Sequence, residues 1–236
     1  MSIAFLFLTR GALPHDHLWG KFFARQDRSA YAIHVHAPPG FVFDETTTRV
    51  PWLFNARVLL PNPVAAWGDA ALVRAEKKLL RRALEASPSA MRFVLLSESC
   101  VPLRSFAFVR AYLYVEASLD HNDRYPGVAM AKDGVPRRAW RKGSQWFAMT
   151  REHATIVAED VEVFEAFEKH CNVTARRAAG GGGGGGGDDD AATSAHTGAN
   201  GWSTFCAPDE HYIPTLFALR GIERELEGRG VTYTNW

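Results

Sequence analysis

The sequence predicts an α/β fold in which a doubly wound, mostly parallel sheet is flanked by helices. Three observations lead to this prediction. Short apolar runs alternate with helical patterns along the first half of the chain. The first run, IAFLFL at residues 3–8, is apolar throughout, as strands covered on both faces are. The order strand, helix, strand, strand, helix, strand, helix requires right-handed crossovers between parallel strands.

The elements of this first half follow from local pattern. The clearest helix is 69–86, because Asp69 is suited to cap its N-terminus and four leucines lie on one side, namely Leu72, Leu79, Leu80 and Leu84. The strand YAIHVH ends at a Pro-Pro-Gly turn. After 3–8 we expect, in order, a helix at 15–25, strands at 31–36 and 56–60, a helix at 69–86, a strand at 92–97 and a helix at 105–117.

The second half is less regular. Residues 172–204 are rich in Gly, Ala, Asp, Ser and Thr, which bury too little surface to offset ordering, so we predict a disordered insertion within a single domain spanning 1–236. Deletion of 178–201 should therefore leave folding intact. Around this segment the patterns predict a short strand at 128–131, a strand at 144–149, helical structure over 151–170, a helix over 208–220 and a strand beginning at 231.

Composition excludes several function classes. The 236 residues carry 27 basic and 26 acidic side chains, and a net charge of +1 does not attract nucleic acid or an anionic membrane. No stretch reaches the roughly 18 apolar residues that span a bilayer. The start, SIAFLFLT, lacks a basic region and is interpreted as a buried strand rather than a signal peptide. Membrane attachment would therefore need an anchor outside this chain.

The cysteines leave two alternatives. Cys171 and Cys206 flank the glycine-rich segment, where a disulfide would join the two ends of a long loop, with Cys100 left unpaired. The alternative is three free thiols in a cytosolic protein. Asn172 begins an Asn-Val-Thr triplet that is an acceptable glycosylation site. A disulfide and a glycosylation site together favour a secretory compartment.

Candidate ligand residues lie where the predicted strands end. In open parallel sheets, ligands bind beyond the carboxyl ends of the strands. Those ends carry Thr9, Arg10 and Gly11, then His36, then the stretch 97–99. No GxGxxG follows the first strand and no GxxxxGK[ST] is present, so neither a dinucleotide fold of the usual kind nor a P-loop is predicted.

Two later motifs each allow a structural and a chemical interpretation. Asp209 and Glu210 are either the acidic first turn of a helix or carboxylates that accept a proton from an alcohol. In WRKGSQWF at 140–147, Arg141 and Lys142 suit an anionic ligand that stacks on a ring; the alternative is an ordinary strand entered through a glycine turn.

The sequence predicts no metal site. His34 and His36 alternate along one strand and point to one face, a spacing that permits metal binding, but no third ligand follows. Buried structural histidines are the better interpretation. Asp188–Asp190 lie in the glycine-flanked tract and are interpreted as solvated charge.

Five stretches in order carry a family resemblance: IAFLFLTRGALP, YAIHVHAPPGF, RFVLLSESCVPL, WRKGSQWF and CAPDEHYIPTL. Together they resemble the plant and algal branch of the core-2/I-branching β-1,6-N-acetylglucosaminyltransferases, glycosyltransferase family 14. The resemblance implies a GT-A-type fold, a UDP-sugar donor, a glycan or glycoprotein acceptor, inversion at the anomeric carbon and no metal or other cofactor. It further implies a type II membrane protein of the Golgi lumen.

The resemblance also implies residue roles. Its catalytic base falls on Glu210. Donor-binding positions fall on Thr9, Arg10, Gly11, His36 and Trp67, although animal relatives carry an aspartate at the position of His36. The acceptor side falls on Arg141, Lys142, Gly143, Ser144 and Trp146. The family's diphosphate-binding arginine and lysine lie beyond the equivalent of Trp236. Two alternatives stay open: transfer of another sugar, such as glucuronic acid or xylose, and a non-catalytic protein that binds a sugar nucleotide or acts as a scaffold.

Overall fold

The computed structural model describes residues 2–55, 64, 68–113, 124–171, 206–226 and 231–232. The strand predicted at 56–60, the tract at 172–204, Asn172 and Trp67 lie outside these ranges, as does nearly all of the strand predicted from residue 231. Residues 231 and 232 themselves form a bend.

A four-stranded, mostly parallel sheet forms the centre of the molecule, as predicted. The strands are β1 (Ser2–Leu8), β2 (Tyr31–His36), β3 (Ala90–Ser97) and β4 (Ala148–Thr150). Their order is β2-β1-β3-β4. The first three pair in parallel, and β4 runs antiparallel to β3. The carboxyl ends of β1, β2 and β3 therefore lie at one edge of the sheet.

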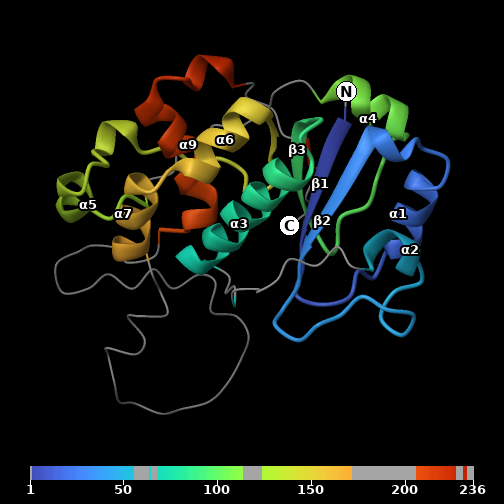
Figure 1. The fold of residues 1–236 in the computed structure, drawn as a ribbon. Coiled ribbons are helices and arrows are strands. Elements are labelled where there is room, and N and C mark those ends of the chain that lie inside the picture. Colours follow the sequence, from blue (N-terminus) through green and yellow to red (C-terminus); the bar gives the residue numbers. More distant parts are fainter. Residues whose placement is uncertain are drawn as a thin grey trace, which may run out of the picture.

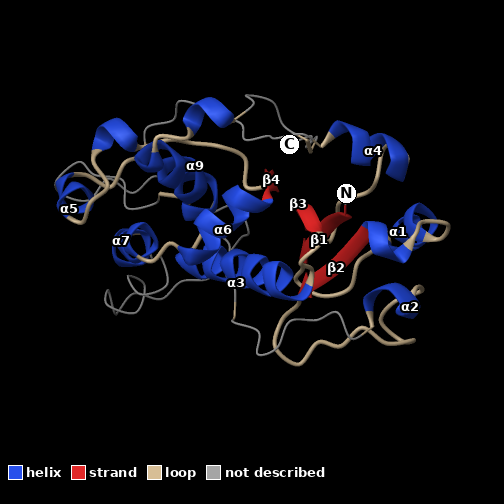
Figure 2. Ribbon diagram, turned by 45° about the horizontal axis from the view of Figure 1, so that its top comes forward, coloured by secondary structure: helices blue, strands red, loops and turns tan. Residues whose placement is uncertain are grey.

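Helices cover both faces of this sheet (Figures 1 and 2). One face carries α1 (Asp16–Phe23), α2 (Pro51–Phe54) and α4 (Phe106–Tyr112). The other face carries α3 (Ala70–Ala86), α6 (Arg151–Glu159), α7 (Glu162–His170) and α9 (Pro208–Arg220), with α5 (Val128–Lys132) beyond α7. Three short 3-10 turns complete the described structure: η1 (Arg28–Ala30), η2 (Arg137–Ala139) and η3 (Glu223–Glu225).

The period-two alternation of β1 divides the core into two layers. Ile3, Phe5 and Phe7 face the α1 side, where aromatic rings from α1, α2 and α4 surround them. Ala4, Leu6 and Leu8 face the α3 side. Every residue of β1 is buried, and the strand is apolar from Ile3 to Leu8, which is the run that the sequence shows.

The long helix forms as its sequence predicts. The Asp69 side chain accepts a hydrogen bond from the Ala71 N–H at 2.8 Å, which confirms Asp69 as the N-cap of α3. Its apolar stripe packs on the sheet and on α6 and α9, with Leu72, Leu79 and Leu80 buried and Leu84 partly buried.

Three predicted elements differ in the structure. Residues 128–131, predicted as a strand, form the helix α5, because Met130 alone of its apolar residues is buried and the Ala-Met-Ala-Lys run favours a helical turn. The strand predicted at 144–149 is confined to 148–150. Residues 144–146 form a turn instead, in which the Trp146 N–H donates to Ser144 Oγ at 3.1 Å.

The helical stretch predicted at 151–170 is two helices. The break lies at Asp160, which has extended backbone (ψ 135°) and ends α6. The Asp160 carboxylate accepts the Phe164 N–H at 3.0 Å, as a cap does for the first turn of α7. Asp160 thus ends α6 and its side chain bonds to the first turn of α7.

Candidate functional site

The first turn of α9 lies at the end of the molecule where β1 and β2 finish (Figure 1). Pro208 occupies the first helical position and Asp209 and Glu210 follow, so the acidic pair does begin a helix. Ala207, directly before it, has φ 41° and ψ 72°, a left-handed conformation that is rare for a residue with a Cβ. The backbone is therefore strained at the entry to the acidic turn.

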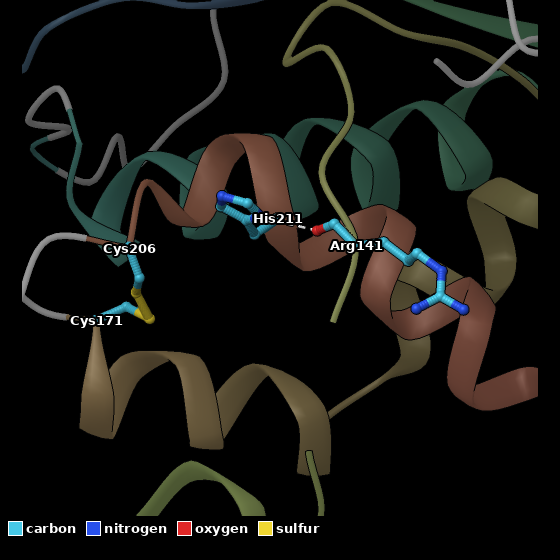
Figure 3. Close-up of a disulfide and its surroundings, with 4 residues drawn as sticks. All are labelled: Arg141, Cys171, Cys206 and His211. Atoms are coloured by element: carbon cyan, nitrogen blue, oxygen red, sulfur yellow. Dashed lines mark hydrogen bonds between the residues drawn. A yellow bond between two sulfur atoms is a disulfide. The ribbon is translucent and has the colours of Figure 1, made fainter. Parts of the chain in front are cut away.

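A disulfide holds this entry. Cys206 precedes Ala207 and is bonded to Cys171, the residue that ends α7 (Figure 3). Both cysteines are buried. The start of α9 is thus covalently tied to the end of α7, across the ends of the segment that the sequence predicts as an insertion.

Glu210 is held on one oxygen and partly open to solvent. Its side chain is 31% exposed, and its Oε2 lies 3.1 Å from Arg124 Nη1 and 3.9 Å from Lys142 Nζ. Its backbone carbonyl accepts the Gly143 N–H at 2.8 Å. The structure therefore brings Glu210 together with two residues predicted for the acceptor side, Lys142 and Gly143.

His211, the next residue of α9, contacts the WRKGSQWF stretch at Trp140 and Arg141. Its Nδ1 hydrogen-bonds to the Arg141 carbonyl at 2.7 Å, which Figure 3 shows, and its ring stacks on Trp140 with centroids 4.6 Å apart. Burial lowers the pKa of the imidazole to about 4, so it is neutral at physiological pH and Nδ1 carries the proton that it donates. His211 is a structural residue of the site.

The side chain of Asp209 is buried in the first turn of α9, and its charge acts on Glu76 of α3. Asp209 is 8% exposed, and burial together with the neighbouring Glu210 charge raises its pKa to about 6. Behind it lies Glu76 of α3, which is 1% exposed and accepts a hydrogen bond from Gln145 Nε2 at 3.0 Å. Gln145 belongs to the WRKGSQWF stretch, so this stretch contacts both α3 and α9.

The predicted donor-side residues lie at the ends of the parallel strands. The Thr9 side chain and N–H both donate to the His36 carbonyl at 2.9 Å, which joins the ends of β1 and β2. Arg10 is almost fully exposed and its Nε lies 2.7 Å from Glu98, just after β3. Gly11 follows on the surface between these ends and Phe41.

Within the described part of the chain, the other residues predicted for the acceptor side, Arg141, Ser144 and Trp146, make no hydrogen bond or ion pair with the Glu210 side chain. The Arg141 guanidinium bonds to Glu223, which follows α9, at 2.6 and 3.3 Å, and in Figure 3 its side chain points away from His211. Ser144 closes the turn before Trp146. Trp146 is partly buried against the core on the α3 side.

His34 has a structural partner, and its Nε2 lies 3.0 Å from Ser87 Oγ. Among the described residues, no group of three or more His, Cys, Asp or Glu side chains is arranged to hold a metal ion. Metal independence stays a prediction of the family resemblance.

Sequence reasoning missed three charged residues. Arg124 lies between the helix predicted at 105–117 and the strand predicted at 128–131, where the sequence indicated no site residue. Glu76 and Lys77 lie within the α3 helix, where Glu76 is four residues from both Leu72 and Leu80. A charged residue on the apolar stripe of a helix is the signal that was available, since such a residue must be buried with the stripe.

Comparison with known proteins assigns the family. The family model described as Core-2/I-Branching enzyme matches residues 3–236. The chain belongs to the Core-2/I-branching enzyme family. The rice protein glycosyltransferase BC10 (Oryza sativa subsp. japonica) is 38% identical over 241 residues, which cover 99% of this chain and 57% of the rice protein. The family resemblance seen in the sequence is confirmed, and the chain spans a little over half the length of that relative.

Two further findings concern the apolar stretches and the cysteines. Within the part of this Core-2/I-branching chain that the structure describes, no helix is long and apolar enough to cross a membrane. The disulfide named as one alternative for the cysteines is present in the structure, with Cα atoms 5.6 Å apart.

Proposed function

We propose that this chain is the catalytic domain of an inverting glycosyltransferase that moves a sugar from a UDP-sugar to a hydroxyl of a glycan, with Glu210 as the base. The sugar we propose is N-acetylglucosamine. Membership of the Core-2/I-branching family supports transfer of a sugar from a nucleotide donor. The observation that carries the role of Glu210 is its carboxylate, held at one oxygen by two cations and bonded through its backbone to the GSQW stretch.

The chemistry follows from this geometry. The acceptor oxygen attacks C1 of the sugar from the face opposite the leaving group, and the bond from C1 to the UDP oxygen breaks. The acceptor proton moves to Glu210 as the new bond forms. Among the described residues, the contacts of this carboxylate are made by Oε2, which leaves Oε1 to take the proton. UDP leaves with the electron pair of the broken bond.

The departing diphosphate needs positive charge. We propose that side chains supply it without a divalent metal, with Arg10, at the end of β1, on the donor side. Thr9, Gly11, His36 and Trp67 are the other proposed donor residues. Lys142, Gly143, Ser144 and Trp146 are proposed for the acceptor side, with Arg141 placing the stretch through Glu223. By family resemblance we further propose residence in the Golgi lumen and glycosylation at Asn172.

The test is transfer or donor hydrolysis by the full-length protein, measured with UDP-N-acetylglucosamine, UDP-glucuronic acid and UDP-xylose. Glu210→Gln should lower kcat by about 10²- to 10⁴-fold, the usual contribution of a general base. Donor affinity by calorimetry should be unchanged. Glu152→Gln is the matched control, because Glu152 is an exposed glutamate in the first turn of another helix, α6.

Each outcome separates the candidate functions. Turnover of one UDP-sugar alone identifies the donor. Donor binding without turnover by the wild type would favour a non-catalytic protein, and full activity in Glu210→Gln would remove Glu210 from the reaction. Loss of activity in EDTA, restored by Mn²⁺, would contradict the metal-free mechanism.

A further inference from the structure

The SESC stretch at 97–100 begins at the last residue of β3 and has no role in the reaction as proposed above. It lies at the edge of the sheet where β1 also ends, because the two strands pair in parallel with Leu8 opposite Ser97. Just beyond these ends, Arg10 Nε donates a hydrogen bond to Glu98 Oε1 at 2.7 Å. This ion pair thus joins two neighbouring strand ends at the edge where parallel sheets bind ligands.

The turn that carries Glu98 is closed by hydrogen bonds. The Cys100 N–H donates to the Ser97 carbonyl at 3.3 Å, and the Ser99 N–H donates to Ser97 Oγ at 3.2 Å. The Cys100 carbonyl accepts the Trp19 side chain at 2.9 Å, which attaches the turn to α1. The Glu98 side chain is only 13% exposed. These bonds and this burial restrict the position of the carboxylate.

Arg10 is held at its backbone and at one side-chain nitrogen. The preceding residue, Thr9, donates through its N–H and its hydroxyl to the His36 carbonyl, both at 2.9 Å. The Arg10 side chain itself is 90% exposed, and within the described residues it bonds through Nε alone. The two Nη groups carry all but one of the N–H donors of an arginine. Those donors are therefore accessible to a ligand at the strand ends.

We propose that Glu98 is a positioning residue for donor binding, which holds the Arg10 guanidinium so that its Nη groups meet the diphosphate of the UDP-sugar. This inference rests on the proposed donor role of Arg10. An exposed arginine samples many rotamers, and fixing one of them on binding weakens affinity. A bond from Nε to a restrained carboxylate limits those rotamers before the donor arrives. The planar guanidinium then presents two donors to two phosphate oxygens.

Two effects of the Glu98 carboxylate oppose each other. Its negative charge repels the diphosphate, whereas its hydrogen bond orients Arg10. Because the arginine is exposed, water and salt weaken the repulsion, and orientation is the larger effect. Substitutions at position 98 separate the two. Glutamine removes the charge and keeps an oxygen that accepts the Nε–H, whereas alanine removes both.

The first test is calorimetry of the full-length protein with UDP and with uridine, which lacks the diphosphate. Glu98→Ala should raise the Kd for UDP by about 2- to 10-fold, the effect of ordering one flexible side chain on binding. The Kd for uridine should not change. Glu98→Gln should bind UDP as the wild type does. If the alanine variant does not fold, Glu98→Ser removes the same carboxylate.

Glu168→Ala is the matched control, because it removes the carboxylate partner of another arginine, Arg74, between α3 and α7. It should leave the Kd for UDP unchanged. An unchanged or lower Kd for UDP in Glu98→Ala would overturn the inference. An equal rise with uridine, or an equal rise in Glu98→Gln, would do the same, because neither follows from orientation of a group that binds the diphosphate.

The second test asks whether Glu98 acts through Arg10. Arg10→Ala alone should raise the Kd for UDP, and Glu98→Ala should have no further effect in that background. Additive losses would overturn the role of Glu98 and leave Arg10 as a donor residue. An Arg10→Ala variant that binds UDP as tightly as the wild type would remove both residues from the donor side. A wild-type protein that binds neither UDP nor a UDP-sugar would overturn the proposed function itself.

Discussion

Ala207 shows how a single residue prepares the proposed site. Its left-handed backbone turns the chain from the disulfide at Cys206 into the first turn of α9, which carries Glu210. Strain of this kind is retained where surrounding contacts hold it, and here the disulfide and the buried helix do so. The conformational strain therefore lies at Ala207, the residue directly before the turn that carries Asp209 and Glu210.

Ala207→Gly should therefore stabilise the protein by about 0.5–1 kcal/mol, because glycine adopts positive φ without the steric penalty of a Cβ. The measurement is the urea midpoint of unfolding. Ala218→Gly in the same helix is the matched control and should destabilise by a similar amount, since Ala218 has helical backbone. A loss of stability in both variants would show that Ala207 is not strained.

Lys77 connects three helices from inside the core. It is 3% exposed, and its ammonium donates to the Val157 and Asp160 carbonyls at 2.6 and 2.7 Å and to the Tyr212 hydroxyl at 2.7 Å. Tyr212 in turn donates to the Asp160 carboxylate at 2.8 Å. This network joins α3, the break between α6 and α7, and α9. Burial lowers the lysine pKa to about 8, which is the electrostatic cost of that connection.

Lys77→Met should destabilise the protein by about 3 kcal/mol in urea unfolding. The methionine removes the cost of a buried ammonium, but the Val157 and Asp160 carbonyls and the Tyr212 hydroxyl lose the hydrogen bonds that Lys77 donates. The attraction between Lys77 and Asp160 is also lost, and these losses are larger. Arg82→Met, at an exposed position of the same helix, should change stability by less than about 0.5 kcal/mol. Equal effects would mean that the network contributes nothing.

The disulfide acts on the same helices from their ends. It closes a loop with a sequence separation of 35 residues, and loop entropy predicts a contribution of about 3–4 kcal/mol for that length. The Cys171→Ser, Cys206→Ser double variant should lose this amount in urea unfolding. Cys100→Ser, which alters the partly buried free thiol, is the control and should lose less than about 1 kcal/mol. An unchanged midpoint in the double variant would contradict the entropic argument.

At the scale of the whole molecule, one sheet separates two core layers, and β1 belongs to both. Leu6 packs on the α3 side and Phe7 on the α1 side, both fully buried. This strand, which ends at Leu8 directly before Thr9, thus contacts both core layers. We propose that the chain folds as one cooperative domain.

Leu6→Ala and Phe7→Ala should each lower the free energy of unfolding, by about 2–5 and about 3–5 kcal/mol respectively. If the chain is one cooperative domain, each variant moves a single transition, and tryptophan fluorescence and far-UV circular dichroism coincide. Two separated transitions in either variant would show that the layers unfold independently.

The sequence by itself determined the α/β class, the family and, within the described residues, the elements up to β3 except α2 and η1. Strong periodicity, the Asp69 cap and ordered motifs are local properties, so they can be read without coordinates. The sequence predicted the short helices and strands after residue 125 less accurately than those before it. Residues 128–131 form a helix in which only Met130 is buried, and the predicted helix at 151–170 breaks at Asp160, whose carboxylate bonds to the first turn of α7.

Only the tertiary structure decided which charges surround Glu210. Arg124 lies 86 positions away in the sequence and Lys142 lies 68 away, so no local spacing predicts that both approach one carboxylate oxygen. The same holds for Glu76 behind Asp209, on a helix that the sequence shows only as amphipathic. Local pattern depends on neighbours along the chain, whereas the charge at a site depends on neighbours in space, and the fold alone brings these together.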